Sequence, residues 1–244
     1  MWPGRHHHGG GAQKDVNRQR IRTLVPRFLE RYLWFFEAAI EDSVARLAAG
    51  QPAGARVLDA GAGESQHKKY FHHCLYTAVD LAVGDSGWDY TQLDVLCDLT
   101  ALPFASSRFD ACLNVVTLEH VRQPERVLRE LGRTLRPGGR LVLVAPQDWE
   151  IHQAPNDYFR YTRHGIEYLL GQAGFTMIEV QPQGGYFRLM GRRMLNGIQF
   201  FSGLWAIPAA LILLPAGMLF PLLDRLDQKR DFTLGYICTA VKGV

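Results

Sequence analysis

The sequence predicts an α/β protein built on a doubly wound parallel sheet, and three observations lead to this prediction. Short apolar runs rich in Val, Leu and Ala lie at 56–60, 76–80, 109–116 and 140–145. Polar stretches of helical length separate these runs, which is typical of βαβ units with helices on both faces of the sheet. The chain has 244 residues and is 47% hydrophobic, which is enough for one good core.

The N-terminal part is expected to hold a leader followed by a helix. Residues 1–14 are rich in glycine and contain three consecutive histidines at 6–8, a pattern typical of a disordered leader, although such a triplet can bind metal weakly. Residues 15–49 form an amphipathic pattern with a basic first half. This helix either lies on a membrane surface, covers an active site or packs on the domain with a solvated basic face.

The first strand ends in a glycine turn, Asp59-x-Gly61-x-Gly63. Glycines let backbone pass close to a bound ligand, and such a turn is expected to open onto a helix N-terminus. The third glycine of a dinucleotide fingerprint would fall at Gln66, so an NAD-binding turn is disfavoured. An acid two residues before the first glycine suits a ligand with an ammonium group and no pyrophosphate, such as S-adenosylmethionine.

Polar side chains also follow the next strands. Asp80, Asp98 and Asn114 lie where strands end, and ligands of doubly wound sheets bind at this edge. The interval from Gly61 to Asp80 is near the roughly 20 residues at which a second-strand acid meets a ribose hydroxyl.

Five ordered segments between about residues 55 and 145 resemble class I S-adenosylmethionine-dependent methyltransferases of the small-molecule, type-11-like branch. They are the glycine turn, Tyr76 to Asp80, Asp98 to Phe104, Phe109 to Asn114, and Leu131 to Val144 with its Pro-Gly-Gly turn. The resemblance implies a Rossmann-like seven-stranded sheet whose antiparallel last strand, 232–241, lies beside a strand at 175–181. It implies S-adenosylmethionine as cofactor, bound by Asp59, Gly61, Gly63, Asp80, Asp98, Leu99 and Asn114.

The chain departs from the family pattern in two places. Ser65 replaces the third glycine, which changes the turn but keeps the cofactor expectation. Asn114 begins no Asn-Pro-Pro-Tyr sequence, and this absence argues against methylation of exocyclic base amines.

A polar and aromatic loop, 145–162, follows the fifth strand and is where an acceptor is expected. His152 is the preferred general base, because an imidazole titrates near neutral pH. Asp157 is expected to orient it, and Arg160 to bind an anionic part of the acceptor. In the structural alternative, Asp157, Arg160 and Thr162 tie the loop to the next helix. His120 is the rival base, and no metal ligand set is predicted.

An insert at 194–223 has no charged residue and is long enough for a membrane helix. If strands flank it in one sheet, both its ends lie on one side. Pro208, Pro215 and Pro221 are expected to break it into short pieces, which favours a re-entrant or interfacial hairpin over 198–223. Basic residues flank it on both sides, as in a cytoplasmic-side anchor: Arg188, Arg192 and Arg193 before it and Arg225, Lys229 and Arg230 after it. A dimer interface or a lid over an apolar acceptor is the alternative.

These features together predict a methyltransferase domain at 50–244 that methylates a small-molecule, lipid-linked or glycan acceptor, at oxygen. The alternative is an inactive methyltransferase-like subunit at a membrane, and an NAD-dependent oxidoreductase is a distant third. The net charge of +3 indicates no nucleic-acid partner, and the four cysteines form no CxxC pair, which is consistent with reduced thiols in the cytosol. We expect a protein peripheral to the inner face of the membrane, and a homodimer is compatible with the sequence.

Overall fold

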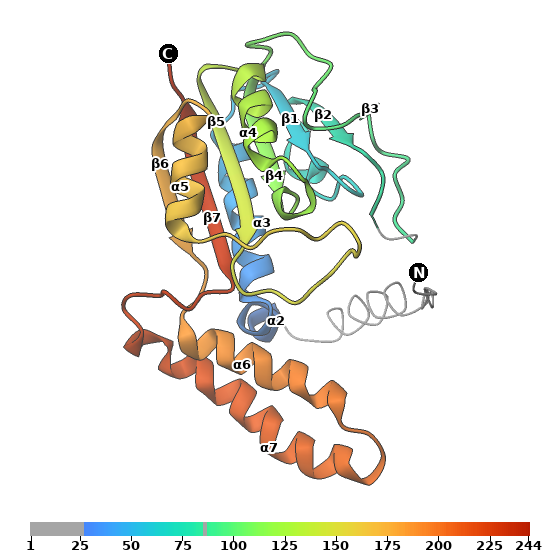
Figure 1. Ribbon diagram of the computed structural model, residues 1–244, viewed down its shortest axis with the longest axis vertical. Helices are drawn as coiled ribbons and strands as arrows, with labels where there is room; N and C mark the ends of the chain where they lie inside the picture. The colour runs from blue at the N-terminus through green and yellow to red at the C-terminus, as the bar shows by residue number, and fades with distance from the viewer. Residues whose placement is uncertain (1–26, 85–86) are drawn as a thin grey trace, which may run out of the picture.

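The computed structural model describes residues 27–84 and 87–244, and its centre is one seven-stranded sheet (Figure 1). The strand order is β3-β2-β1-β4-β5-β7-β6, with β7 antiparallel to both of its neighbours and the remaining pairs parallel. The strands are β1 (Arg56–Ala60), β2 (Leu75–Asp80), β3 (Val95–Leu96), β4 (Phe109–Val115), β5 (Leu135–Pro146), β6 (Phe175–Pro182) and β7 (Gly235–Lys242). The predicted fold class, including the antiparallel last strand, is confirmed.

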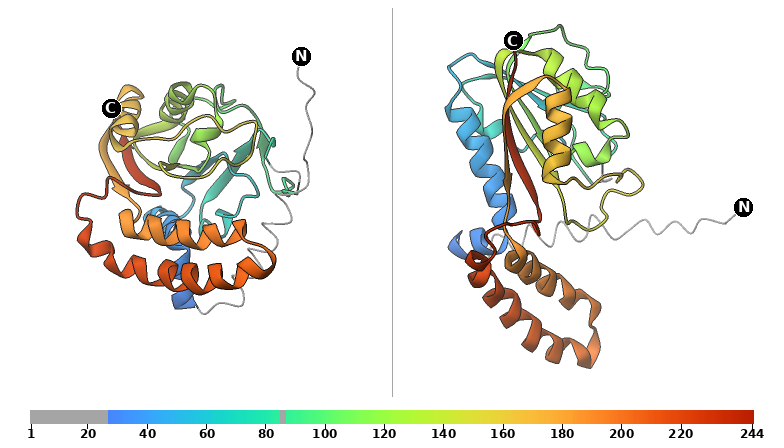
Figure 2. Two further views of the ribbon diagram at one scale, coloured as in Figure 1. Left: turned by 60° about the horizontal axis from the view of Figure 1, so that its bottom comes forward. Right: turned by 60° about the vertical axis from the view of Figure 1, so that its left-hand side comes forward.

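Helices cover both faces of this sheet, as the right-hand view of Figure 2 shows. The helices are α2 (Arg27–Leu33), α3 (Phe35–Ala49), α4 (Pro124–Thr134), α5 (Arg163–Gln172), α6 (Tyr186–Gly197) and α7 (Ala206–Leu219). Alternate side chains of each strand point to opposite faces. Val57 of β1 therefore packs with α3, whereas its neighbour Leu58 packs in the core under α4 and α5.

The glycine turn does not open onto an α-helix, contrary to the prediction. Between β1 and β2 the chain forms only the short 3-10 helix η1 (Lys68–Tyr70). Residues 64–74 carry mostly polar side chains with no apolar stripe at helical spacing, so an amphipathic helix would have no face to bury. Instead α3, which precedes β1 in the chain, covers this face with Phe36 and Val44, both fully buried.

The predicted N-terminal helix is divided in two within the described part. Helix α2 ends at Leu33 and α3 begins at Phe35. Because Phe36, Ile40 and Val44 are buried against the sheet, residues 35–49 follow the packed alternative. The leader at 1–14 and the arginines at 18, 20 and 22 lie outside the described residues.

The apolar insert forms a helical hairpin between β6 and β7. Helix α6 leads through η3 (Ile198–Phe200) and η4 (Gly203–Trp205) into α7, and η5 (Phe220–Leu226) leads back toward the sheet. The two arms pack closely at glycines, since a Cβ on Gly191 would lie 2.9 Å from the carbonyl oxygen of Gly217. Because β6 pairs directly with β7, both ends of the hairpin return to one side, as predicted.

The three prolines do not fragment the hairpin as expected. Helix α7 continues through Pro215, and Pro208 and Pro221 lie in the first turns of α7 and η5. First-turn positions tolerate proline because their backbone N–H groups have no partner within the helix. The result is one helical segment, Gly203–Leu226, that is long and apolar enough to cross a membrane.

Candidate active site

The glycine turn after β1 is held against two neighbouring strands. The backbone N–H groups of Gly61 and Ala62 donate to the carbonyl oxygen of Val79 at 2.8 and 3.0 Å. Gly61 has a φ of +84°, and a Cβ there would lie 2.3 Å from Cγ2 of Thr117. Thr117 in turn donates its hydroxyl to the Gly61 carbonyl at 3.2 Å. Glycine is therefore required both by the backbone conformation and by the approach of the segment after β4.

Asp80, at the end of β2, fixes the other side of the turn. Its carboxylate accepts the backbone N–H of Gly63 at 3.0 Å and that of Ala82 at 2.8 Å. Asp98 follows β3 and accepts the backbone N–H of Thr100 at 2.8 Å, whereas the Leu99 side chain is buried in the core. The predicted residues thus gather at one edge of the sheet, and Leu99 offers this edge only its backbone.

Two buried acceptors lie beside the turn without a full set of donors. Asp59 is fully buried; Oδ2 accepts the hydroxyl of Tyr76, and Oδ1 has no hydrogen-bond partner among the described residues. Burial raises the pKa of Asp59 to about 7. Asn114 donates to the carbonyl of Ala60 at 2.7 Å, and its Oδ1 is also without a partner in the described part. Such orphaned oxygens fit a ligand that brings N–H donors.

Two aromatic side chains of the loop after β2 flank the turn, and the sequence reasoning missed them. A Cβ on Gly63 would lie 3.1 Å from the Trp88 ring, so ring and turn are in contact. Tyr90 accepts the backbone N–H of Gly84 at 2.8 Å and lies 6.1 Å from Trp88 between ring centroids. The Trp-x-Tyr spacing at 88–90 was the available signal.

In the loop after β5, Asp157 and Arg160 tie the chain together. Arg160 donates to both oxygens of Asp157 at 2.6 and 2.8 Å and to the carbonyls of Trp149 and Glu150 at 3.0 Å each. This ion pair lowers the pKa of Asp157 to about 2. The guanidinium is fully engaged within the loop, which corrects the expectation that Arg160 binds an anion of the acceptor.

Asp157 positions His152 through the backbone. Its Oδ2 accepts the His152 backbone N–H at 2.9 Å but lies 3.6 Å from the ring nitrogen Nδ1, which is beyond a hydrogen bond. The nearest acceptor for Nδ1 is the carbonyl of Glu150 at 3.0 Å. Asp157 therefore forms a hydrogen bond with the backbone of His152 and not with its imidazole ring, which was the predicted contact.

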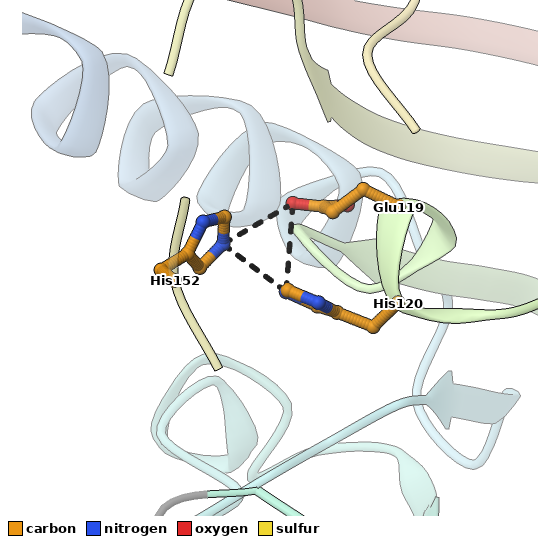
Figure 3. Close-up of side chains that lie close together, drawn as sticks. All are labelled: Glu119, His120 and His152. Atoms are coloured by element: carbon orange, nitrogen blue, oxygen red, sulfur yellow. Dashed lines mark hydrogen bonds and ion pairs between the residues drawn. The ribbon is translucent and has the colours of Figure 1, made fainter. Parts of the chain in front are cut away.

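His152 and its rival His120 lie together rather than apart. Their Nε2 atoms are 3.1 Å from each other, and both face Glu119 (Figure 3). Glu119 and His120 belong to the 3-10 helix η2 (Leu118–His120), whose N-cap is Thr117. The contact of Thr117 with Gly61 places this cluster next to the glycine turn. Sequence reasoning overlooked Glu119, although it directly precedes His120.

A family model described as a methyltransferase domain matches residues 58–143. The demethylmenaquinone methyltransferase of Mycolicibacterium paratuberculosis is 38% identical over 144 residues, covering 54% of this chain and 62% of that protein. The Renibacterium salmoninarum demethylmenaquinone methyltransferase is 31% identical over 115 residues, covering 40% of this chain. Residues 58–143 thus match a methyltransferase domain. The chain spans only 62% and 44% of the length of these two relatives.

Solved structures share the fold of this methyltransferase domain. The Burkholderia thailandensis 1,6-didemethyltoxoflavin-N1-methyltransferase matches with a TM-score of 0.54 and 20% identity, covering 99% of this chain and 94% of that one. The [4+2]-cyclase SpnF matches with a TM-score of 0.56 and 21% identity, covering 84% of this chain and 81% of that one. Since the same fold also supports a cyclase, function depends on the site and not on the fold.

Proposed function

We propose that this chain transfers a methyl group from S-adenosylmethionine to an oxygen of a small, lipid-linked or lipid-soluble acceptor. The observation that carries the proposal is the conjunction of the Asp80-held glycine turn with the Glu119–His120–His152 cluster beside it. Relatives named as quinone and toxoflavin methyltransferases support the small-molecule class of acceptor. One phosphoethanolamine methyltransferase and one didemethyltoxoflavin methyltransferase of this fold have structures in complex with S-adenosylhomocysteine, which supports the cofactor.

The residues present fit this cofactor. Gly61 and Gly63 leave room for close approach, Asp80 offers carboxylate oxygens to hydroxyl groups, and Asp59 and Asn114 have free buried acceptors for an ammonium or amino group. The bound cofactor would supply a methyl group on a sulfonium sulfur, and the protein contributes chiefly positioning. In the loop, the neutral His152 ring with its proton on Nδ1 has a free Nε2 lone pair that can accept the hydroxyl proton of the acceptor.

The helical hairpin supports contact with a membrane. Its large apolar side chains are exposed, and only 11% of the most apolar 18-residue stretch within Gly203–Leu226 is buried. This segment is therefore not the core helix of the domain. Complete burial of one such side chain contributes about 1.5–3 kcal/mol. The exposed set comprises Phe200, Phe201, Leu204, Trp205, Ile207, Leu211, Ile212, Leu214, Leu219, Leu222, Leu223 and Leu226.

The basic residues near the hairpin form two groups, one paired with the rest of the domain and one exposed to solvent. Arg192 pairs with Glu37 at 3.0 Å, and Arg193 pairs with Glu150 at 2.8 Å, so these two arginines anchor α6 to the domain. On the returning side, Arg225, Lys229 and Arg230 are exposed and form no ion pair with a described residue. We assign these three cations to anionic lipid headgroups.

Figure 1 shows the hairpin below the sheet edge at which β5 ends, the edge that also carries the loop of His152. A hairpin lying in one face of a membrane would hold that edge toward the lipid. This geometry favours an acceptor reached from the membrane surface and a protein peripheral to the inner, cytoplasmic face. A second copy of the chain or a folded-down lid is the competing occupant of the apolar surface.

Methyl transfer is tested with purified protein, labelled S-adenosylmethionine and lipid extracts, followed by mass spectrometry of the products. We expect one labelled small molecule and calorimetric binding of S-adenosylhomocysteine. The His152→Ala variant should lower turnover by about 100-fold while leaving cofactor affinity nearly unchanged, and the exposed His164→Ala on α5 serves as control. Cofactor binding without any labelled product would favour the inactive subunit, and NAD binding instead would refute the proposal.

Membrane contact is tested by flotation with liposomes that contain anionic lipid. Replacing the exposed Leu211 and Ile212 by aspartate should weaken binding by at least about 100-fold, because each substitution removes the burial of a large apolar side chain, about 1.5–3 kcal/mol. Leu75→Asp is the matched control, because Leu75 is also an exposed leucine but lies at the opposite edge of the sheet. A monomer that stays unbound would point to a lid, and a stable dimer to an interface between copies.

A further inference from the structure

Three acceptor atoms from two segments converge beside the glycine turn without a donor between them. Glu119 Oε1 lies 3.9 Å from His120 Nε2 and 3.8 Å from His152 Nε2, and the two nitrogens are 3.1 Å apart (Figure 3). The carboxyl side chain is fully buried, and the two imidazoles are 10% and 23% exposed. Figure 3 shows all three groups pointing toward one common point.

The tautomers of both imidazoles are fixed by backbone carbonyls. His120 Nδ1 lies 2.6 Å from the carbonyl oxygen of Asn156, and His152 Nδ1 lies 3.0 Å from that of Glu150. A carbonyl can only accept, so each Nδ1 carries the proton. In the neutral rings both Nε2 atoms are then bare, and two lone pairs face each other across 3.1 Å.

Glu119 adds a third acceptor to this space. Both of its carboxyl oxygens are buried, and neither receives a hydrogen bond from another described residue. The nearest cation, Arg160, is bonded to Asp157 and to loop carbonyls and does not reach Glu119 with a hydrogen bond. A buried acid without a partner is costly, so the arrangement calls for a cation.

We propose that Glu119, His120 and His152 bind one divalent transition-metal ion, with Zn²⁺ as the best match to two imidazoles and a carboxylate. Ligand atoms about 2.0–2.1 Å from a tetrahedral ion lie about 3.3–3.4 Å from each other, close to the observed 3.1 Å between the nitrogens. Glu119 then needs to approach by only about half an ångström. Metal-binding histidines characteristically donate their second N–H to a carbonyl, as both do here.

Three protein ligands leave at least one coordination position open, which is the pattern of a catalytic ion. Its role in methyl transfer rests on the proposed function. An acceptor hydroxyl on the ion loses its proton more easily, and the proton passes to water. The oxygen forms a bond to the methyl carbon as the bond from that carbon to sulfur breaks, which leaves S-adenosylhomocysteine. In the metal-loaded protein, His152 is thus a ligand, and the ion replaces it in promoting deprotonation.

The test is calorimetric titration of chelator-treated full-length protein with ZnCl₂, with Co²⁺ absorption as a second probe of coordination. Because the histidines at 6–8 can bind metal themselves, the same titration is run with all three replaced by alanine. We expect one site with a Kd of about 1 μM or tighter in the triple-alanine protein, and a tetrahedral Co²⁺ spectrum.

In the same background, Glu119→Gln, His120→Ala and His152→Ala should each weaken Zn²⁺ binding by more than about 100-fold. His164→Ala, which removes an exposed histidine, should leave it unchanged. Far-ultraviolet circular dichroism and a cooperative urea transition verify that each variant is folded. Absence of the site from the triple-alanine protein, or an unchanged Zn²⁺ affinity in Glu119→Gln, would overturn the proposal. The three side chains would then share protons instead of a metal ion.

The metal site and the proposed methyl transfer fail in different ways. Zn²⁺ binding is measured without cofactor or acceptor, so it survives a failure of the methyltransferase proposal. If the ion binds but a chelator leaves labelled-methyl transfer unchanged, the site is structural and the catalytic role of the ion is refuted.

Discussion

The structure allows the effect of Gly61→Ala on the free energy of unfolding to be worked out contact by contact. A φ of +84° costs an alanine about 1–2 kcal/mol, offset by about 0.4–1 kcal/mol because alanine restricts the unfolded chain. In addition, the new Cβ would lie 2.3, 2.4 and 2.7 Å from Cγ2, Oγ1 and Cβ of Thr117. Overlap of this kind costs about 1–3 kcal/mol. We therefore expect a loss of about 1–4.5 kcal/mol in the free energy of unfolding.

Gly138→Ala is the matched control, because Gly138 has a φ of +78° but an added Cβ would meet no atom of the described residues within 4 Å beyond its own chain neighbours. It should cost at most about 1.5 kcal/mol, since only the backbone term remains. Urea unfolding measures both variants, and calorimetry with S-adenosylhomocysteine should show at least tenfold weaker binding only for Gly61→Ala. Equal losses in the two variants would refute the argument that Thr117 crowds the turn, and Thr117→Gly should partly rescue Gly61→Ala.

The remaining predictions concern three carboxylates. Asp80→Ala should weaken S-adenosylhomocysteine binding by about 1.5–3 kcal/mol in calorimetry, because the turn loses its charged acceptor; unchanged affinity would contradict this role. Asp59, with its pKa raised to about 7, stabilises the fold below about pH 4 and loses this contribution as pH rises through 7. In urea unfolding, the free energy of unfolding of Asp59→Asn should therefore rise by up to about 4 kcal/mol relative to that of wild type between pH 4 and pH 8. Parallel pH profiles of the two proteins would show that Asp59 does not have a raised pKa. Asp157, with its pKa lowered to about 2, stabilises above pH 4 and loses about 2 kcal/mol as pH falls toward 2, a slope that Asp157→Asn should abolish.

Local pattern was sufficient to predict much of the architecture. The apolar runs at 56–60 and 76–80 coincide with β1 and β2, because a strand buried on both faces needs a continuous apolar run. Thr162 caps α5 as its sequence position suggests, accepting the backbone N–H of Gly165 at 3.1 Å. The missing helix after Gly63 was not foreseen, since glycine spacing says nothing about which element covers that face of the sheet.

The strands, the glycine turn and the polar residues at the strand ends were all predictable from the residues alone, because they depend on side-chain periodicity and on backbone conformations that few residues adopt. Which polar groups meet became clear only from the folded arrangement of the loops. His120 and His152 were rivals in the sequence and are neighbours in space, with the overlooked Glu119 beside them. Arg160 was expected to face a ligand and instead bonds Asp157. Hydrogen-bond partners depend on how a loop folds back on the sheet, and neither composition nor spacing encodes that path.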